Sequence, residues 1–376
     1  MRFKTHGTAT LSEFLGDNVA YRNLVPADPR LPPVAALCAE LGLESGAIPR
    51  KAEPAYGRVV AELLRRGRQL ELPGGSIERL IYVGDSAHND GLAFANLLAA
   101  SGWAGWAFIG RDSPGEPPEV KIEDELYLAN RWSALPAFTA FLDYEGFPVD
   151  ERTAVVLDLD KTAIGARGRN DAAINAARVE GVQRTVADLL GDGFDGAAFE
   201  AAYGALNQSA YHPFTTDNQD YLAYICLILG AGLVSLEELV GQVQDGSLAD
   251  FFTFIARVQA RRAELAATGL APIHDQVWAC VQAGDPTLFK AFRYNEYLTT
   301  AARFGGAPDA PVDDLLANQI VLTQEVRAAA AALRARGALL FGISDKPDEA
   351  SLPNAQQAQA GMLPLHHLPT LAVGEA

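Results

Sequence analysis

Residues 155–162 constrain the fold of this chain more than any other stretch, because an apolar run of strand length ends there in acidic residues. The β-branched run is followed by Asp158 and Asp160, with Thr162 two positions further on. Such a run is typical of a buried strand. In open α/β sheets, ligands bind beyond the carboxyl ends of the strands. The sequence therefore predicts that this strand delivers two carboxylates to a site of chemistry, with Asp158 as a candidate nucleophile.

Two other apolar segments end in polar residues in the same way. Residues 79–83 run into Asp85, with Asp90 five positions later, and residues 338–343 end at Ser344. Helical patterns alternate with these strand-like segments along the chain. This alternation predicts an α/β core built on a parallel, doubly wound sheet.

Between the first acidic strand and the last strand, the hydrophobic pattern has helical period only. We therefore expect an α/β core at residues 1–168 plus 332–376 and an all-helical insertion at residues 169–331. The helices expected in the insertion cover residues 176–190, 197–206, 218–229, 236–243, 249–265, 273–281, 287–304 and 315–336. Those expected outside it cover residues 11–15, 34–43, 55–66, 133–144 and 349–360, with strands at 107–110 and, at the sheet edge, 363–368.

The composition excludes several classes of partner. The 376 residues carry 30 Lys plus Arg against 47 Asp plus Glu, a net charge of −17, which argues against nucleic acid and anionic membranes. No apolar run reaches the ~18 residues of a membrane helix. The three cysteines, Cys38, Cys226 and Cys280, lie far apart, as expected of reduced thiols. We expect a cytoplasmic protein that binds a small anion through local cations or a metal.

Four places in the chain together resemble the signature motifs of the haloacid dehalogenase-like (HAD) superfamily. In the order that this superfamily numbers them, they are Asp158, Asp160 and Thr162; Ser344; Lys51 in a Lys-x-x-Pro context; and Asp85 with Asp90. The resemblance implies a Rossmann-like parallel sheet with an inserted helical cap. It also implies Mg²⁺-dependent hydrolysis of a small phosphorylated metabolite through an aspartyl-phosphate.

The order of the motifs along the chain differs from the usual one. Here the third and fourth motifs precede the first, and the helical insertion and the second motif follow it. This order indicates a circular permutation, which compact domains tolerate because chain ends often lie close together at the surface. Residues 110–152 would then link the usual ends. The alternative is a swapped homodimer, in which each half completes its sheet with a neighbouring chain.

The resemblance also implies a metal site at the strand ends. Mg²⁺ would be bound by Asp158, Asp85 and the backbone carbonyl of Asp160, since hard cations take oxygen ligands. Asp90 lies one position further from Asp85 than in many family members. Either Asp90 or Asn89 could therefore be the second residue of the acidic motif that contacts the metal or supports its ligands.

The other residues would act on the phosphoryl group. Asp158 would attack phosphorus, and Asp160 would serve as general acid and then as general base. Ser344 would donate a hydrogen bond to a phosphoryl oxygen, and Lys51 would neutralise developing charge, with Lys346 as a rival for that role. The phosphate-binding candidates also include Thr162, which would position Asp160, and Arg167 at the hinge of the insertion.

The insertion would act as a lid that excludes water and supplies specificity. Its polar candidates are Arg167 and Arg169 in the hinge, and, in a polar loop between two helices, Gln208, Tyr211, His212, Thr215 and Thr216. Two alternative functions remain open at this stage. One is a phosphotransferase or phosphomutase with the same residues, and the other is a non-catalytic regulatory protein that binds a phosphorylated ligand.

Overall fold

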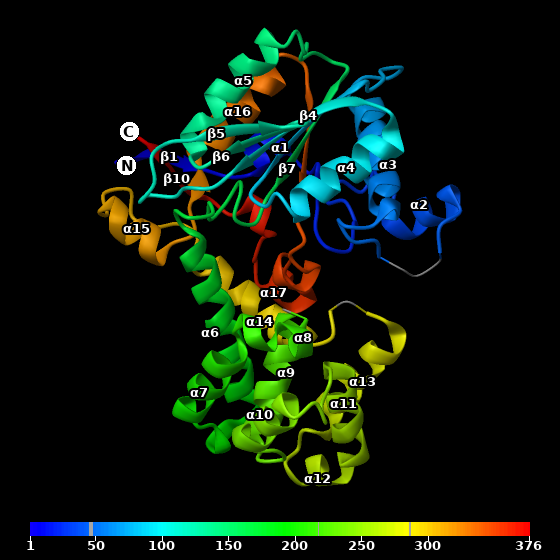
Figure 1. Cartoon of the computed structure of the whole chain (residues 1–376), viewed down its shortest axis with the longest axis vertical. Coiled ribbons are helices and arrows are strands. Elements are labelled where there is room, and N and C mark those ends of the chain that lie inside the picture. Colours follow the sequence, from blue (N-terminus) through cyan, green and yellow to red (C-terminus); the bar gives the residue numbers. More distant parts are fainter. Residues whose placement is uncertain (45–47, 217, 286) are drawn as a thin grey trace. The chain divides into compact units, whose positions relative to one another are not determined.

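The computed structural model describes residues 1–44, 48–216, 218–285 and 287–376, and the chain divides into two compact units (Figure 1). One unit combines residues 1–176 with 300–376, and the other comprises residues 177–299. These bounds differ from those predicted for the insertion, 169–331. The periodicity of a helix does not say which unit the helix packs in, so helical segments at both ends of the predicted insertion belong to the first unit.

The first unit contains a seven-stranded sheet with every strand parallel to its neighbours except the last. Its spatial order is β2 (Val19–Ala20), β9 (Leu339–Ile343), β7 (Thr153–Asp158), β3 (Arg79–Gly84), β4 (Ala104–Gly110), β6 (Leu126–Ala129) and β5 (Val120–Glu123). Only β5 runs antiparallel, to β6. The prediction of an α/β fold with a largely parallel sheet is confirmed.

Helices cover both faces of the central strands, which explains why those strands are apolar throughout. Figure 1 shows α3 (Pro54–Glu71) and α4 (Asn89–Ser101) on one side, and α5 (Leu135–Tyr144) and α16 (Gln324–Ala335) on the other. Every residue of β7 is buried. Alternate residues such as Ala154 and Val156 join a core with α3 and α4.

A second, smaller sheet brings the chain termini together. In it, β1 (Phe3–Ala9) pairs antiparallel with β10 (Thr370–Glu375), so that Phe3 lies opposite Glu375. β10 also pairs in parallel with β8 (Leu322–Thr323). The N and C labels accordingly lie side by side in Figure 1. The edge strand predicted at 363–368 is wrong, because a 3-10 helix, η5 (Leu365–His367), lies there and the strand begins five residues beyond Leu365.

Several predicted helices are interrupted. The segment 315–336 contains α15 (Val312–Asn318) and α16, separated by β8, and the segment 349–360 contains only η4 (Asp348–Ala350) and α17 (Ala355–Gln359). Pro353 disfavours helical backbone before it, and Asn354 caps α17. Residues 110–152 are more than a linker, because β5 and β6 lie there and extend the sheet. The short helices of the N-terminal region are α1 (Ser12–Leu15) and α2 (Val34–Leu41), and η1 (Trp132–Ala134) precedes α5.

Helices are the only regular elements described in the second unit. They include α7 (Gly196–Leu206), α8 (His212–Thr215), α9 (Gln219–Gly230), α10 (Leu236–Gln244), α11 (Phe251–Ala260), α12 (Arg262–Ala267) and α13 (Ala271–Ala283), while α6 (Asp171–Leu190) and α14 (Lys290–Ala301) continue into the first unit. α9 is buried on almost all sides, as expected of a helix that is apolar around its circumference. Among all described residues, no helix is long and apolar enough to cross a membrane.

The close crossing of α3 and α4 gives a test of this packing. A Cβ atom at Gly57 would lie 2.1 Å from the backbone oxygen of Asn96, whereas one at Gly67, in the same helix, would meet Leu339 at an ordinary 3.6 Å. We expect Gly57→Ala to lower the free energy of unfolding by about 3 kcal/mol through overpacking. Gly67→Ala should be neutral or raise it by up to about 1 kcal/mol, through helix propensity. Chemical denaturation measures both, and equal effects would contradict the crossing.

Candidate functional site

Three carboxylates from adjacent elements meet at the carboxyl edge of the sheet. Asp158 is the last residue of β7, Asp85 directly follows the neighbouring strand β3, and Asp90 lies in the first turn of α4. One oxygen of each carboxylate lies within 4.8 Å of the others. The two strands pair in parallel register, with Val83 opposite Leu157, so their ends reach the same level. The fold therefore concentrates negative charge at one point.

A buried lysine lies within this group. The Nζ atom of Lys51 is 2.7 Å from Oδ1 of Asp158 and 2.8 Å from Oδ1 of Asp90. Oδ2 of Asp345 lies 3.7 Å from the same nitrogen. The backbone carbonyl of Lys51 accepts a hydrogen bond from the Asn96 side chain, which ties the loop before α3 to α4. The ammonium of Lys51 is thus held by carboxylates, and the backbone of Lys51 is held to α4 by the Asn96 side chain.

Asp90 is fixed by an array of donors. Its Oδ2 accepts hydrogen bonds from the backbone N–H groups of Asp85 (2.9 Å) and Ser86 (3.0 Å), and Tyr82 donates to its Oδ1 (3.2 Å). A Cβ atom at Gly84 would lie 2.5 Å from the Asp90 carboxyl group, so glycine is needed there. Burial raises the pKa of Asp90, but Lys51 and these donors outweigh it and lower the pKa. Asp90 is therefore a firmly ionised anchor.

The other two carboxylates are electrostatically strained. Burial first, and then the charge of Asp90, raise the pKa of Asp85 to about 7, against the ion pair that Asp85 makes with Arg167. Burial likewise holds the pKa of Asp158 well above its ordinary value, although Lys51 opposes the shift. Like charges that crowd a desolvated site disfavour ionisation. A divalent cation would remove this penalty.

The donor set fits a hard cation. The clustered ligand atoms are all carboxylate oxygens, which Mg²⁺ prefers, and neither histidine nor cysteine belongs to the cluster. Asp85, Asp90 and Asp158 would hold the ion. The carboxylate of Asp160 is not one of the clustered groups among the described residues. It lies in the turn after β7, where Lys161 has a φ of 65° and Asp160 bridges to Ile164.

Ser344 is brought to the same edge by strand pairing. β9 pairs with β7 so that Ile343 lies opposite Asp158, and Ser344 follows directly. Its buried hydroxyl accepts a hydrogen bond from the backbone N–H of Lys346 (3.1 Å), so its own hydrogen can serve another acceptor. Thr162 is fully buried. Its hydroxyl has no hydrogen-bond partner among the described residues, and its carbonyl accepts from Thr323.

The two arginines expected at the hinge have different surroundings. Arg167 ion-pairs with Asp85 and is two-fifths exposed, so its guanidinium lies beside the acidic cluster. Arg169 is buried and ion-pairs with Asp112 (2.7 Å) and Glu325 (2.8 Å). These contacts give Arg169 a structural role within the first unit.

The remaining sequence candidates lie elsewhere. Asn89 is exposed beside the buried Asp90, and Lys346 is buried two residues after Ser344. Gln208, Tyr211, His212, Thr215 and Thr216 belong to the second unit. Thr215 is buried, and its hydroxyl donates to the carbonyl of Tyr211. That hydrogen bond stabilises the helical turn between Tyr211 and Thr215.

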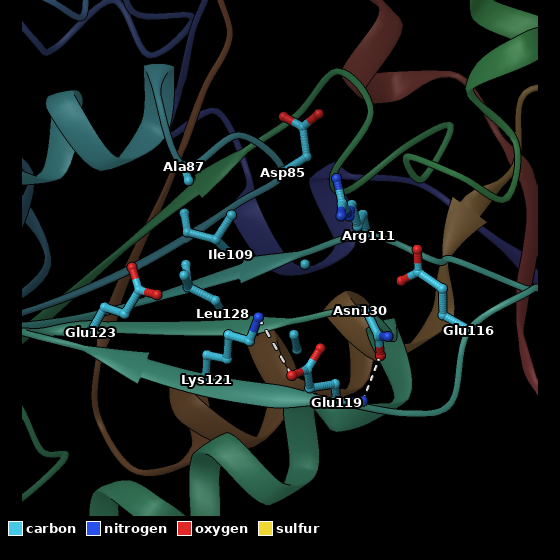
Figure 2. Close-up of a pocket in the computed structure, with 12 residues that line it drawn as sticks. Asp85, Ala87, Ile109, Arg111, Glu116, Glu119, Lys121, Glu123, Leu128 and Asn130 are labelled. Atoms are coloured by element: carbon cyan, nitrogen blue, oxygen red, sulfur yellow. Dashed lines mark hydrogen bonds and ion pairs between the residues drawn. The ribbon is translucent and has the colours of Figure 1, made fainter.

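A pocket of about 320 Å³ opens beside Asp85 (Figure 2). Figure 2 shows Asp85 above the end of β4, and Lys121 of β5 paired with Glu119, which directly precedes that strand. The charged and polar lining residues are Asp85, Arg111, Glu116, Glu119, Lys121, Glu123 and Asn130. Sequence reasoning missed this pocket because β5 is only four residues long and is exposed along its whole length.

Two residues of the acidic site itself were also missed. Asp345 follows the end of β9 next to Ser344, so the same strand-end rule could have found it. Tyr82 lies inside β3 as one of several buried aromatic residues, and no local signal marks its hydrogen bond to Asp90.

Comparisons with protein-family models, curated proteins and solved structures found no match. The function must therefore be argued from the geometry of the site.

The raised pKa of Asp85 predicts how stability depends on pH. Between about pH 4 and pH 7 the folded protein binds more protons at Asp85 than the unfolded chain does, so stability without divalent cations should fall as pH rises through that window. Asp85→Asn should reduce this dependence, to which Asp158 and Asp348 also contribute through their raised pKa values, and should raise the free energy of unfolding at pH 8 by about 2 kcal/mol. Thermal unfolding in EDTA measures the effect.

The matched control is Asp143→Asn, which changes an exposed carboxylate paired with Arg336 and should keep the wild-type pH profile. Mg²⁺ should raise the melting temperature of the wild type more than that of Asp85→Asn, because a ligand stabilises the state that binds it. An unchanged pH profile in Asp85→Asn would rule out the strained carboxylate.

Proposed function

We propose that this protein is a Mg²⁺-dependent phosphohydrolase with a circularly permuted HAD-like core, acting on a small phosphorylated metabolite. The observation that carries the proposal is the Lys51 ammonium, which bonds both Asp158 and Asp90 beside a third carboxylate. A nucleophilic carboxylate, a charge-neutralising lysine and a hard-cation site are the three groups that transfer of a phosphoryl group to an aspartate requires.

The strand order supports the permutation. The six mutually parallel strands of the main sheet can be numbered from β7 to the C-terminus and then on from the N-terminus, leaving out the antiparallel edge strand β5. In this numbering β7, β9, β2, β3, β4 and β6 take positions one to six. Their spatial order then reads 3-2-1-4-5-6, the order of the doubly wound fold. The antiparallel pairing of β1 with β10 supports the same interpretation, because it holds the N- and C-termini side by side. In the usual order of the motifs, these two ends would be joined in one continuous chain.

The position of the acidic cluster follows from that order. β7 and β3 are neighbours whose next strands, β9 and β4, lie on opposite sides of the pair. Such a topological switch point is where open α/β sheets bind ligands. Asp158 and Asp85 stand at the ends of these two strands.

In the proposed mechanism, Asp158 attacks phosphorus and the alcohol leaves, which gives an aspartyl-phosphate that water then hydrolyses. Bound Mg²⁺ would supply charge neutralisation between the carboxylate and the phosphoryl oxygens. Lys51 holds Oδ1 of Asp158 and carries positive charge toward the transferring group. Ser344 donates to a phosphoryl oxygen. Asp160 gives a proton to the leaving oxygen and later takes one from water.

The pocket beside Asp85 would hold the rest of the substrate. Its volume of about 320 Å³ suits a small metabolite. Arg111, which is exposed at the mouth of this pocket, and Arg167 offer positive charge next to the metal ligands.

We expect Asp158→Asn to lower kcat for aryl phosphate hydrolysis by at least about 10³-fold, because it removes the nucleophile. EDTA should abolish the wild-type activity and Mg²⁺ should restore it. The surface variant Asp143→Asn should keep wild-type rates. Release of inorganic phosphate measures each rate, and metal-dependent activity that survives in Asp158→Asn would reject the mechanism.

Product analysis with added alcohols then separates the related functions. Free phosphate alone supports a hydrolase, whereas a new phosphate ester identifies a phosphotransferase. Binding of Mg²⁺ and phosphate with no turnover across a panel of phosphorylated metabolites would identify a regulatory binding protein.

A further inference from the structure

A second cluster of metal-ligating side chains lies outside the acidic site. Asp17, which follows α1, faces His366 and His367, which end η5. One ligand atom of each residue lies within 4.8 Å of the others. Nε2 of His367 is 3.0 Å from Oδ1 of Asp17, and Nε2 of His366 is 3.5 Å from the same oxygen. The two imidazole nitrogens thus point at one carboxylate.

An ordinary ion pair does not account for the buried histidine. His366 is fully buried, and its Nε2 has no hydrogen-bond partner among the described residues. A buried polar atom is seldom left without a partner, because its desolvation is then uncompensated. The nitrogen faces Asp17 and His367, so a cation among the three residues would satisfy it.

The opposite side of the His366 ring is already engaged. Its Nδ1 lies 3.1 Å from the hydroxyl of the buried Tyr21. When Nδ1 donates to Tyr21, Nε2 presents its lone pair toward Asp17, an arrangement that is usual for metal-bound histidines. Burial, and secondarily His367, lower the pKa of His366 to about 4, which agrees with a neutral ring at pH 7.

We propose that Asp17, His366 and His367 form a binding site for a divalent transition metal such as Zn²⁺, separate from the acidic Mg²⁺ site. Two imidazole nitrogens and one carboxylate oxygen are ligands that Zn²⁺ takes in three-residue sites, with water in a fourth position. Mg²⁺ disfavours such nitrogen donors. Asp17 is half exposed and His367 one-third exposed, so solvent can reach the site.

The site would tie distant parts of the chain together. Asp17 precedes β2, the edge strand that pairs with β9, whereas the histidines precede β10. A metal bound to these residues would clamp the C-terminal segment to the edge of the main sheet. Because only the folded chain brings the ligands together, binding should raise the melting temperature.

Spectroscopic titration with Co²⁺, a coloured substitute for Zn²⁺, tests the site directly. In excess Mg²⁺, which would occupy the acidic site, we expect one Co²⁺ per chain with visible bands that report nitrogen ligation, and displacement of that ion by Zn²⁺. Asp17→Asn and His367→Gln change accessible side chains and should each weaken binding at least about tenfold. Neither change should alter the fold, which circular dichroism monitors.

Two control variants distinguish this site from other ligands. His6→Gln changes an exposed histidine of β1 and should leave Co²⁺ affinity unchanged. Asp85→Asn removes a ligand of the acidic cluster and should also retain the nitrogen-ligated Co²⁺ spectrum, whatever its effect on phosphatase activity. The proposal is overturned if no nitrogen-ligated Co²⁺ spectrum appears, or if Asp17→Asn and His367→Gln bind Co²⁺ like the wild type.

Discussion

The ammonium of Lys51 is the interaction on which the arrangement of the site depends. It is buried, so it must be paired, and its partners Asp158 and Asp90 come from different elements. Removing one partner of a buried ion pair typically costs about 3–5 kcal/mol, because the other charge is left uncompensated. The loop before α3, the end of β7 and the start of α4 therefore hold their mutual positions through a single charge. The close crossing of α3 and α4 at Gly57 supports the same geometry by packing alone.

Positive charge does not balance negative charge at this edge of the sheet. Asp85, Asp90 and Asp158 face Lys51 and the partly exposed Arg167. Burial first, and then the excess negative charge, raise the pKa values of Asp85 and Asp158. A folded protein that keeps such a cluster gives up stability locally, as functional sites commonly do. The histidine cluster is of a different kind. Its nitrogen donors and single carboxylate create little excess charge, and the two proposed sites would therefore select different metals.

The strands and site residues that could be predicted from the sequence are those marked by a pattern within a single element. β3, β7 and β9 were predictable because each is a buried apolar run that ends in a polar residue, and the same rule brought Asp85, Asp158 and Ser344 to one edge. β1 and β5 were not predictable, because their residues are largely exposed and their pairing partners are specified elsewhere in the chain. The hydrogen-bonding role of Tyr82 and the convergence of Asp17 with His366 likewise arise only from packing between distant segments.

The order of the motifs along the chain is weak evidence about the site, whereas the order of the strands in space is strong evidence. Hydrogen bonds between β9, β7 and β3 are the same wherever the chain begins, since the ends meet through β1 and β10. Moving the termini changes which loops must close and hence the entropy of loop closure, a quantity that varies only slowly with loop length. The chemistry at the strand ends is left unchanged. The carboxylates and the lysine therefore meet at the switch point between β7 and β3 whatever their order along the chain.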